Sequence, residues 1–269
     1  MRANGDTMAA VARLSTAAVK GTALTHPDAV ELTAGGARGD RVVHLIDERG
    51  RLVNGKQAPP LATVHSRLDG DELTLELPEG DVVTGPLALA EQVTTSFYGR
   101  PVPGRIVAGS FADALSEVAG RAVRLVRPAY EVAAVDAAPV SLVSRATLAA
   151  FRVASDGPEV HWADRFRILV EIDGVDGREE ETWQGEHIAV GEAVIEIDAP
   201  IPRCSVTTVD PARGVSDFDT LARLRDWRDD GEVTLGMWGS VVRPGRVTCG
   251  DTVSIASSPS DATSDRGRR

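Results

Sequence analysis

The 269-residue sequence predicts a mainly β protein, built as β-barrels with a few short packing helices. Strand signals outnumber helix signals, and most are short runs that alternate in polarity or are rich in β-branched residues. The clearest runs cover residues 42–46, 72–77, 193–197 and 246–249. Glycines beside Asp, Glu or Arg suit the tight turns between such strands, and they stand at Gly50, Gly70, Gly80 and Gly174.

Three helical segments interrupt the strands. The first follows Ser110, a favourable N-cap, and ends at Gly120. The second follows Ser144, and the third starts near Asp217, which can cap it. The apolar residues of the third helix fall on roughly one face, and they are Phe218, Leu221, Leu224 and Trp227. We expect all three helices to pack against the strands without chemistry of their own.

The length of the chain suits two domains of ordinary size. A β-like run at 122–126 is followed by Arg-Pro-Ala-Tyr at 127–130, and we place the boundary there. The predicted domains are therefore residues 9–128, a smaller N-terminal β-barrel, and residues 129–256, a second barrel. Residues 257–269 are rich in Ser, Asp and Arg without periodicity, which predicts a disordered tail.

Composition excludes several classes of partner. The formal net charge is -11, and no block of Lys and Arg interleaves with aromatic residues, so a nucleic-acid partner is not expected. No apolar run approaches the roughly 20 residues that cross a bilayer, so no membrane partner is expected. The N-terminus lacks the long apolar stretch of a signal peptide, and we therefore expect a cytoplasmic protein.

The two cysteines are too few for a disulfide framework or a cysteine-rich cluster site. Cys204 follows the predicted strand 193–197, with Arg203 beside it. An adjacent cation favours the thiolate, which is the form that binds soft metals. A buried structural cysteine is the alternative, and local chemistry alone does not exclude it. Cys249 lies in an alternating run, and we expect it to pack.

The segment Pro-Arg-Cys-Ser-Val-Thr-Thr-Val-Asp-Pro at 202–211 resembles the cysteine motif of the MOSC family, named for the C-terminal domain of molybdenum cofactor sulfurase. Further segments resemble that family in the expected order, at 144–148, 165–167, 180–183, 236–239 and 244–247. The N-terminal half resembles the small β-barrel that precedes this domain in the amidoxime-reducing component, through residues 19–21, 39–41 and the hairpin 54–57. The resemblance covers most of residues 9–256.

The resemblance implies a molybdenum–pterin cofactor, Mo-molybdopterin, with Cys204 as metal ligand and catalytic residue. It implies that cationic and hydroxyl side chains hold the cofactor, and by position in the motifs these are Lys20, Arg41, Lys56, Ser144, Thr147, Arg165, Arg167 and Arg203. For each basic residue the alternative is a solvated surface charge. At the level of the family, the resemblance also implies pyridoxal phosphate binding.

Three local expectations accompany this site. Arg165 and Arg167 alternate with Phe166 on a strand-like run, so we expect both to lie on one face. Asp40 is expected to orient Arg41. Asp210 and the proline that follows it are turn formers, and we expect them to shape the loop after the cysteine rather than to act in catalysis.

The resemblance favours an enzyme that reduces small N-hydroxylated compounds with electrons from a separate donor protein. A sulfur carrier, or a carrier of the cofactor without turnover, is the alternative. A domain that kept the barrel and lost the cofactor is a third possibility, because two positions depart from the family pattern. Ile168-Leu169 stands where Pro-Asn is common, and Lys56 stands where Arg is common. Substrate identity and oligomeric state do not follow from the sequence.

Overall fold

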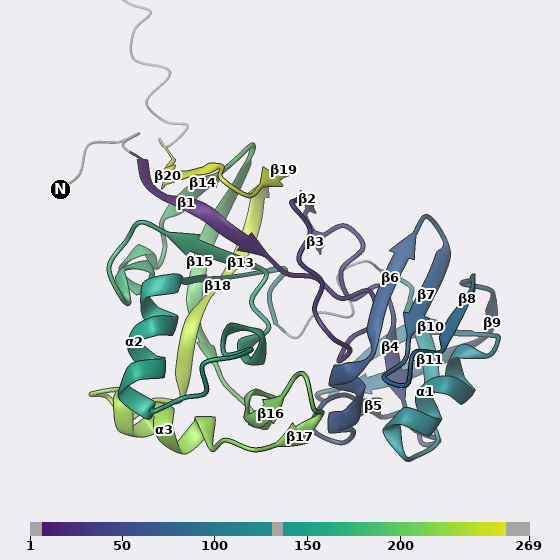
Figure 1. Ribbon diagram of the computed structural model, residues 1–269. Coiled ribbons are helices and arrows are strands. Elements are labelled where there is room, and N and C mark those ends of the chain that lie inside the picture. The colour runs from purple at the N-terminus through teal and green to yellow at the C-terminus, as the bar shows by residue number, and fades with distance from the viewer. Residues whose placement is uncertain (1–6, 131–136, 257–269) are drawn as a thin grey trace, which may run out of the picture.

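The computed structural model describes residues 7–130 and 137–256, and it contains two β bodies side by side (Figure 1). The predicted tail 257–269 lies outside the described residues. The first body is a closed barrel, as the sequence predicted. Its strands neighbour one another in the order β1 (Thr7–Leu14), β13 (Val170–Asp173), β12 (Val140–Ser144), β18 (Thr234–Arg243), β15 (Ala193–Pro202), β14 (His187–Val190) and β20 (Thr252–Ile255).

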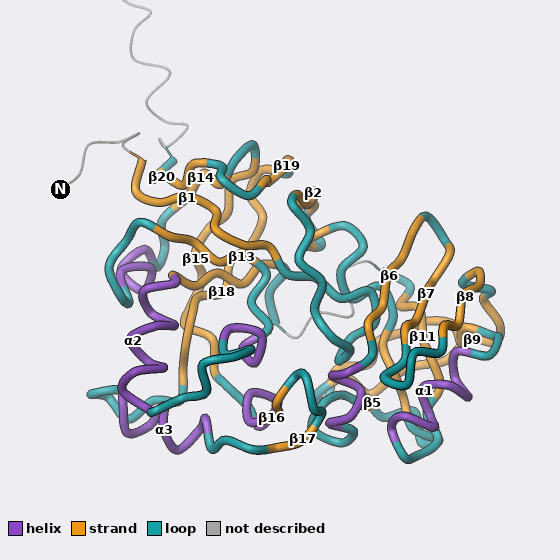
Figure 2. Tube along the Cα trace, viewed as in Figure 1, coloured by secondary structure: helices purple, strands orange, loops and turns teal. Residues whose placement is uncertain are grey.

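The second body is smaller and comes from the N-terminal half. Its five-stranded sheet has the order β5 (Leu52–Val53), β4 (His44–Ile46), β11 (Arg124–Pro128), β10 (Arg100–Val107) and β9 (Leu89–Phe97). A three-stranded sheet of β6 (His65–Asp69), β7 (Glu72–Glu76) and β8 (Val82–Pro86) accompanies it, with the 3₁₀ turn η1 (Pro59–Thr63) and the helix α1 (Phe111–Ala119). Figure 2 shows strands in both bodies, with α2 and α3 beside the barrel and α1 beside the smaller body.

The N-terminal strand β1 is part of the closed barrel. It pairs antiparallel with β13 on one side and with β20 on the other. Strand β2 (Ala29–Thr33) pairs with β3 (Gly36–Ala37) and with β19 (Gly245–Thr248) near the other end of the chain. The ranges 9–128 and 129–256 therefore do not coincide with the two bodies in space, because the first 37 residues contribute strands to the barrel side.

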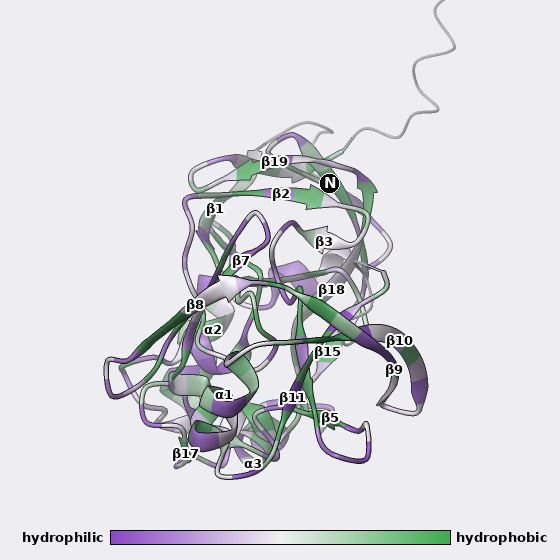
Figure 3. Ribbon diagram, turned by 90° about the vertical axis from the view of Figure 1, so that its right-hand side faces the viewer, coloured by the Kyte–Doolittle hydropathy of each residue, from purple (hydrophilic) through white to green (hydrophobic). Residues whose placement is uncertain are grey.

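Alternation of buried and exposed residues explains the barrel core. Along β15, Ile195 and Ile197 are fully buried, whereas Glu196 between them is exposed. Each such buried aliphatic side chain contributes about 1.5–3 kcal/mol relative to exposure. In Figure 3, hydrophobic residues gather along the strands of both bodies, and α1 carries both hydrophobic and hydrophilic residues. The predicted strands and the turns at Gly50, Gly70, Gly80 and Gly174 are confirmed, and all four glycines have positive φ.

The three predicted helices are present, with two differences at their starts. Gly120 ends α1 in the left-handed conformation as predicted, but Ser110 makes no side-chain cap hydrogen bond. Ser144 caps α2 (Arg145–Ser155) by accepting from the backbone N–H of Thr147. The prediction that Asp217 caps the third helix is wrong: α3 spans Thr220–Trp227, and its cap is Asp219. Phe218 therefore precedes this helix.

The cap of α3 gives a testable prediction. The carboxylate of Asp219 accepts from Ala222 N at 3.1 Å, and it satisfies one of the N–H groups that the first turn leaves unpaired. Asp219→Ala is expected to lower the free energy of unfolding by about 1 kcal/mol, measured by urea denaturation. Asp219→Ser keeps an acceptor, so its free energy of unfolding is expected to fall by only a few tenths of a kcal/mol. Equal losses in the two variants would contradict the capping role.

The second cysteine does not pack, so that prediction is wrong. Cys249 is exposed, and it follows β19 in a turn instead of lying within the strand. Within residues 7–130 and 137–256, none of the helices has the length and apolar character needed to cross a membrane.

Candidate functional site

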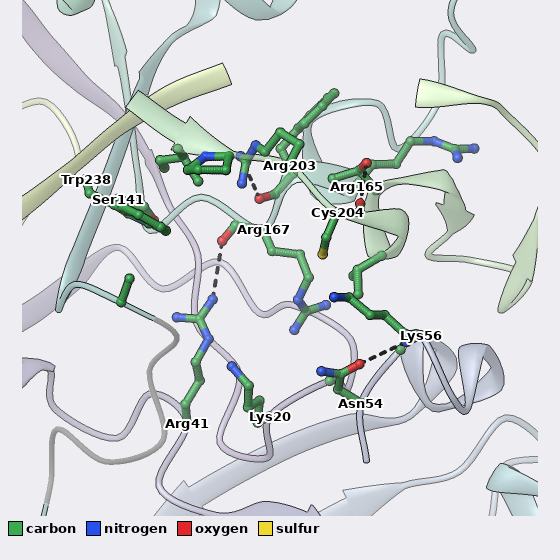
Figure 4. A pocket seen from close by; sticks show the side chains of 18 of the residues that line it. Lys20, Arg41, Asn54, Lys56, Ser141, Arg165, Arg167, Arg203, Cys204 and Trp238 are labelled. Atoms are coloured by element: carbon green, nitrogen blue, oxygen red, sulfur yellow. Dashed lines mark hydrogen bonds between the residues drawn. The ribbon is translucent and has the colours of Figure 1, made fainter. Parts of the chain in front are cut away.

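A cavity of about 340 Å³ lies where the two bodies meet, and both contribute to its wall. The N-terminal half contributes a group of turns and one hairpin residue: Lys20, Gly21, Arg41, Asn54, Gly55, Lys56 and Tyr98. The C-terminal half contributes Ala137, Ala138, Ser141, Arg165, Phe166, Arg167, Ile201, Pro202, Arg203, Cys204, Val206, Thr207 and Trp238. Figure 4 shows most of these side chains.

Cys204 stands between the end of β15 and the 3₁₀ turn η5 (Ser205–Thr208). Its carbonyl oxygen accepts from both the backbone N and the Oγ1 of Thr207, at 3.0 Å each, and these bonds fix the turn. The side chain is partly exposed, and its sulfur points into the cavity, toward which Arg167 and Lys56 also extend (Figure 4). The sulfur is therefore accessible to a ligand in the cavity.

The two bodies touch at two points in the segment that follows the cysteine. A Cβ added to Gly55 would lie 3.5 Å from Cγ1 of Val206, in ordinary contact. Further along, Gly214 has φ +63, and a Cβ there would lie 2.6 Å from Cα of Pro60. This residue belongs to the hairpin of β16 (Val209–Asp210) and β17 (Val215–Ser216), which Asp210 shapes by accepting from Ala212 N at 2.8 Å, as predicted. The loop after the cysteine is thus held against the N-terminal body.

Arg165 and Arg167 reach the cavity, but not from one face of a strand. The prediction is wrong because Arg165 lies in the 3₁₀ turn η3 (Ala163–Phe166), and Arg167 ends that turn with φ +53. Arg165 is buried, pairs with Asp217 at 2.8 Å, and donates to the carbonyl oxygen of Thr208 at 3.2 Å. Arg167 donates to Thr22 O at 2.8 Å. The two cations are therefore held from different directions.

The remaining cations are also anchored. Arg203 donates to Phe166 O at 3.0 Å and lies over the Phe166 ring, 5.6 Å from its centre. Arg41 pairs with Asp40, as predicted, and donates to Arg167 O at 3.3 Å. Asp40 in turn accepts from Ala17 N at 2.8 Å, so that it connects Arg41 to the backbone near β1.

Two of the predicted cofactor-binding residues lie outside the cavity lining. Ser144 and Thr147 are fully buried and do not line the cavity. Their hydroxyl oxygens lie 2.8 Å apart, and Thr147 Oγ1 also accepts from Arg178 N at 2.7 Å. Their motif is therefore a helix cap, because the cap geometry at the start of α2 uses both side chains.

The departure at Ile168-Leu169 lies away from the cavity wall. Both side chains are buried: Ile168 packs with Phe166 and Leu235, and Leu169 belongs to the core of the closed barrel. The backbone N–H of Leu169 donates to Ser141 Oγ at 2.9 Å. These apolar residues therefore stabilise the barrel beside the site.

Several residues of the cavity wall were not predicted from the sequence. Asn54 anchors the turn that carries Lys56, because its Oδ1 accepts from Lys56 N at 3.0 Å. Its amide also donates to the hydroxyl of Tyr98 at 2.9 Å. Trp238 and Ser141 come from the paired strands β18 and β12. A local sequence pattern predicts a strand or a turn, but it does not show which side chains of that element face a cavity formed with a distant segment.

The charge of the cavity is opposite to that of the whole chain. Its described lining includes six cations, and it includes no Asp or Glu: Lys20, Arg41, Lys56, Arg165, Arg167 and Arg203. The acidic partners Asp40 and Asp217 stand behind the wall. Such a site attracts anions and offers charge-assisted hydrogen bonds to phosphate oxygens. With one accessible cysteine sulfur, the donor set fits a phosphate-bearing ligand that carries a soft metal.

A buried histidine lies behind this wall. Burial, and then the positive charge of Lys20, lower the pKa of His44 to about 4. Its Nε2 lies 2.8 Å from Thr95 Oγ1, and its ring packs against Phe97 at 5.5 Å between centres. Lys20 Nζ lies 5.4 Å from the centre of the same Phe97 ring. The neutral imidazole is therefore part of the support under Lys20.

The lowered pKa of His44 predicts a pH-dependent stability. Between 6.5 and about 4 the unfolded chain binds a proton that the folded protein does not, so folding weakens as pH falls. The stability that depends on neutral His44 is fully present above pH 6.5. As the pH falls through this window, the free energy of unfolding decreases by at most about 3 kcal/mol. Urea unfolding at about pH 7.5 and about pH 4.5 is expected to show a smaller difference for His44→Gln than for the unmodified protein. If the free energy of unfolding changed equally between the two pH values in both proteins, this role of His44 would be contradicted.

Comparison with known families covers nearly all of the described chain. Residues 8–121 match the family model of the MOSC N-terminal beta barrel domain, and residues 129–254 match that of the MOSC domain. Residues 122–128 lie between the two matches.

Curated relatives match across both halves. Mitochondrial amidoxime reducing component 2 of Bos taurus is 29% identical over 262 residues, covering 84% of this chain and 77% of that protein. Mitochondrial amidoxime-reducing component 1 of Homo sapiens is 27% identical over 261 residues, covering 84% and 75%. Molybdenum cofactor sulfurase of Drosophila persimilis is 25% identical over 250 residues, which is 83% of this chain but 31% of that protein. Among solved structures, the YUAD protein from Bacillus subtilis aligns with a TM-score of 0.44 at 13% identity, covering 91% of this chain and 93% of that chain.

Proposed function

The chain belongs to the MOSC family and carries both the MOSC domain and its N-terminal β-barrel domain, and from this we propose that it is a molybdenum-dependent reductase of N-hydroxylated compounds. The observation that carries the proposal is the sulfur of Cys204, which points into a cavity lined by six cations. The relatives named for amidoxime reduction match over most of their own length, which supports the same class of substrate.

Different residues of the cavity would hold different parts of the cofactor. Cys204 would supply a thiolate ligand to the metal, since soft sulfur donors suit it. Lys20, Lys56 and Arg167 would bind the phosphate and other anionic oxygens. Arg165 instead holds the loop after the cysteine, because its charge is already paired with Asp217 and its Nη1 donates to Thr208 O.

When bound, a molybdenum cofactor supplies a two-electron reduction. In the proposed reaction the N–O bond of an N-hydroxylated substrate breaks with two electrons and two protons, and the products are the N–H compound and water. The electrons come from a separate donor protein. Trp238 lines the cavity and would give the substrate an apolar contact beside the cationic side chains.

Metal analysis and turnover test the proposal together. Protein produced with ample molybdate is expected to contain about one molybdenum and one pterin per chain, and to reduce benzamidoxime with dithionite as electron source. Metal and pterin without turnover of N-hydroxylated substrates would support the cofactor carrier instead. A cyanide-labile sulfur without metal would support the sulfur carrier. A protein with none of these would refute both the reductase and the carriers.

A further inference from the structure

The tip of the β9–β10 hairpin holds a tyrosine in an unfavourable backbone conformation. Phe97 and Arg100 pair across the hairpin, so Tyr98 and Gly99 form a two-residue turn. Both have positive φ, +51 for Tyr98 and +82 for Gly99, as a type I′ turn requires. Such a turn favours Asn-Gly, and a bulky residue at its first position is strained. Tyrosine at this place therefore needs an explanation other than the turn itself.

The turn is held firmly at the edge of the cavity. Phe97, next to the tyrosine, is buried beneath Lys20 and His44 and anchors the hairpin from inside. The hydroxyl of Tyr98 accepts from Asn54 Nδ2 at 2.9 Å, and Lys56 Nζ lies 5.6 Å from the centre of its ring. The ring is thereby fixed in one position, although 57% of Tyr98 is exposed.

An exposed aromatic ring with a fixed position beside a cavity can bind a flat group. Tyr98 and Cys204 line the same cavity, Tyr98 from the N-terminal half of the chain and Cys204 from the C-terminal half. Aromatic rings favour stacked or edge-on contact with other conjugated rings over contact with saturated groups of similar size. Backbone strain kept in a residue of this kind is typical of ligand contacts.

We propose that Tyr98 determines substrate specificity by packing its ring against the flat, conjugated part of an N-hydroxylated substrate at the cavity edge. This proposal rests on the reductase function proposed above. It predicts that amidoximes carrying a phenyl group are preferred to those carrying a cyclohexyl group of similar size.

Benzamidoxime and cyclohexanecarboxamidoxime provide the matched probes. Their affinities for the purified full chain are measured by ligand-observed NMR or calorimetry, and their kcat/KM values with dithionite are measured in parallel. In Tyr98→Asn, the preference for the phenyl compound is expected to fall on the order of tenfold in both measurements. Tyr98→Phe keeps the ring and is expected to retain the preference.

Folding provides the second readout. Tyr98→Asn creates the favoured Asn-Gly turn, so its thermal midpoint is expected within about 3 °C of the unmodified protein. Asp156→Asn is the matched control, because Asp156 also has positive φ (+53) but ends α2 outside the cavity lining. It is expected to leave the phenyl preference unchanged.

The outcomes separate this proposal from the reductase function. Binding of the phenyl compound that depends on Tyr98, without turnover, supports the role of Tyr98 and refutes the reductase. Turnover with the same phenyl preference in Tyr98→Asn overturns the role of Tyr98 and leaves the reductase standing. If Tyr98→Asn loses affinity and kcat/KM equally for both compounds, or if neither compound binds the unmodified protein, the proposed role of Tyr98 is also overturned.

Discussion

Replacing Cys204 with alanine is expected to remove molybdenum from the purified protein and to lower amidoxime reduction by more than about 100-fold. Loss of a residue that only supports a metal ligand costs 10- to 100-fold as a rule, and loss of the ligand itself costs more. The side chain is partly exposed and packs little, so the thermal midpoint is expected to change by no more than about 2 °C. Inductively coupled plasma mass spectrometry and the dithionite assay measure the two effects.

The second cysteine supplies the control for this experiment. Cys249 is exposed and does not line the cavity, so Cys249→Ala is expected to retain both metal and activity. Cys204→Ser tests the element itself, because it keeps the size of the side chain and replaces the soft sulfur by a hard oxygen. Full molybdenum in Cys204→Ala would show that the cofactor is held by other groups, and would remove the basis of the proposed function.

Replacing Asp217 with alanine is expected to lower the free energy of unfolding by about 4 kcal/mol. Arg165 is almost fully buried, and the 2.8 Å pair with Asp217 compensates its charge. Removing one partner of such a pair leaves a buried charge without compensation, which is the main cost. Arg165 also donates to Thr208 O, so the loop after Cys204 is expected to loosen, with a loss of molybdenum. Urea denaturation and metal analysis measure these effects.

A neighbouring arginine provides a control that distinguishes the effect of the buried ion pair from that of an exposed one. Asp217 also pairs with Arg213, whose side chain is 62% exposed. Exposed pairs contribute about 0–1 kcal/mol, so Arg213→Ala is expected to have a small effect on unfolding and none on metal content. Similar losses in Asp217→Ala and Arg213→Ala would contradict the role assigned to Arg165.

Much of the fold was predictable because the local signals were strong. Alternation along 193–197 and the glycine at 120 each depend on residues near in sequence, and both predictions are confirmed. Helix starts were harder, because Asp217 and Asp219 are equally good caps by chemistry. The ion pair with Arg165, 52 positions away, decided which aspartate stayed free to cap α3. Such a contact is invisible to a local pattern.

The site was predictable only in part for the same reason. The resemblance pointed to Cys204 and to the cations that the structure brings together around it. It also pointed to Ser144 and Thr147, where the motif serves a helix cap. Tyr98 escaped notice because Tyr-Gly is a poor match to the usual turn signal, and its value depends on Asn54 and Lys56 in another loop.

Strand β1 imposes an order on biosynthesis. It lies between β13 and β20, so the first strand of the barrel pairs with the last, more than two hundred residues later. During synthesis, β1 can pair with β13 once residues 170–173 are made, but its other edge stays unpaired until residues 252–255 are present. The N-terminal body, whose strands all come from residues 44–128, can fold during that delay. Closure of the seven-stranded barrel therefore waits for strand β20, whereas the N-terminal body can fold before that strand is made.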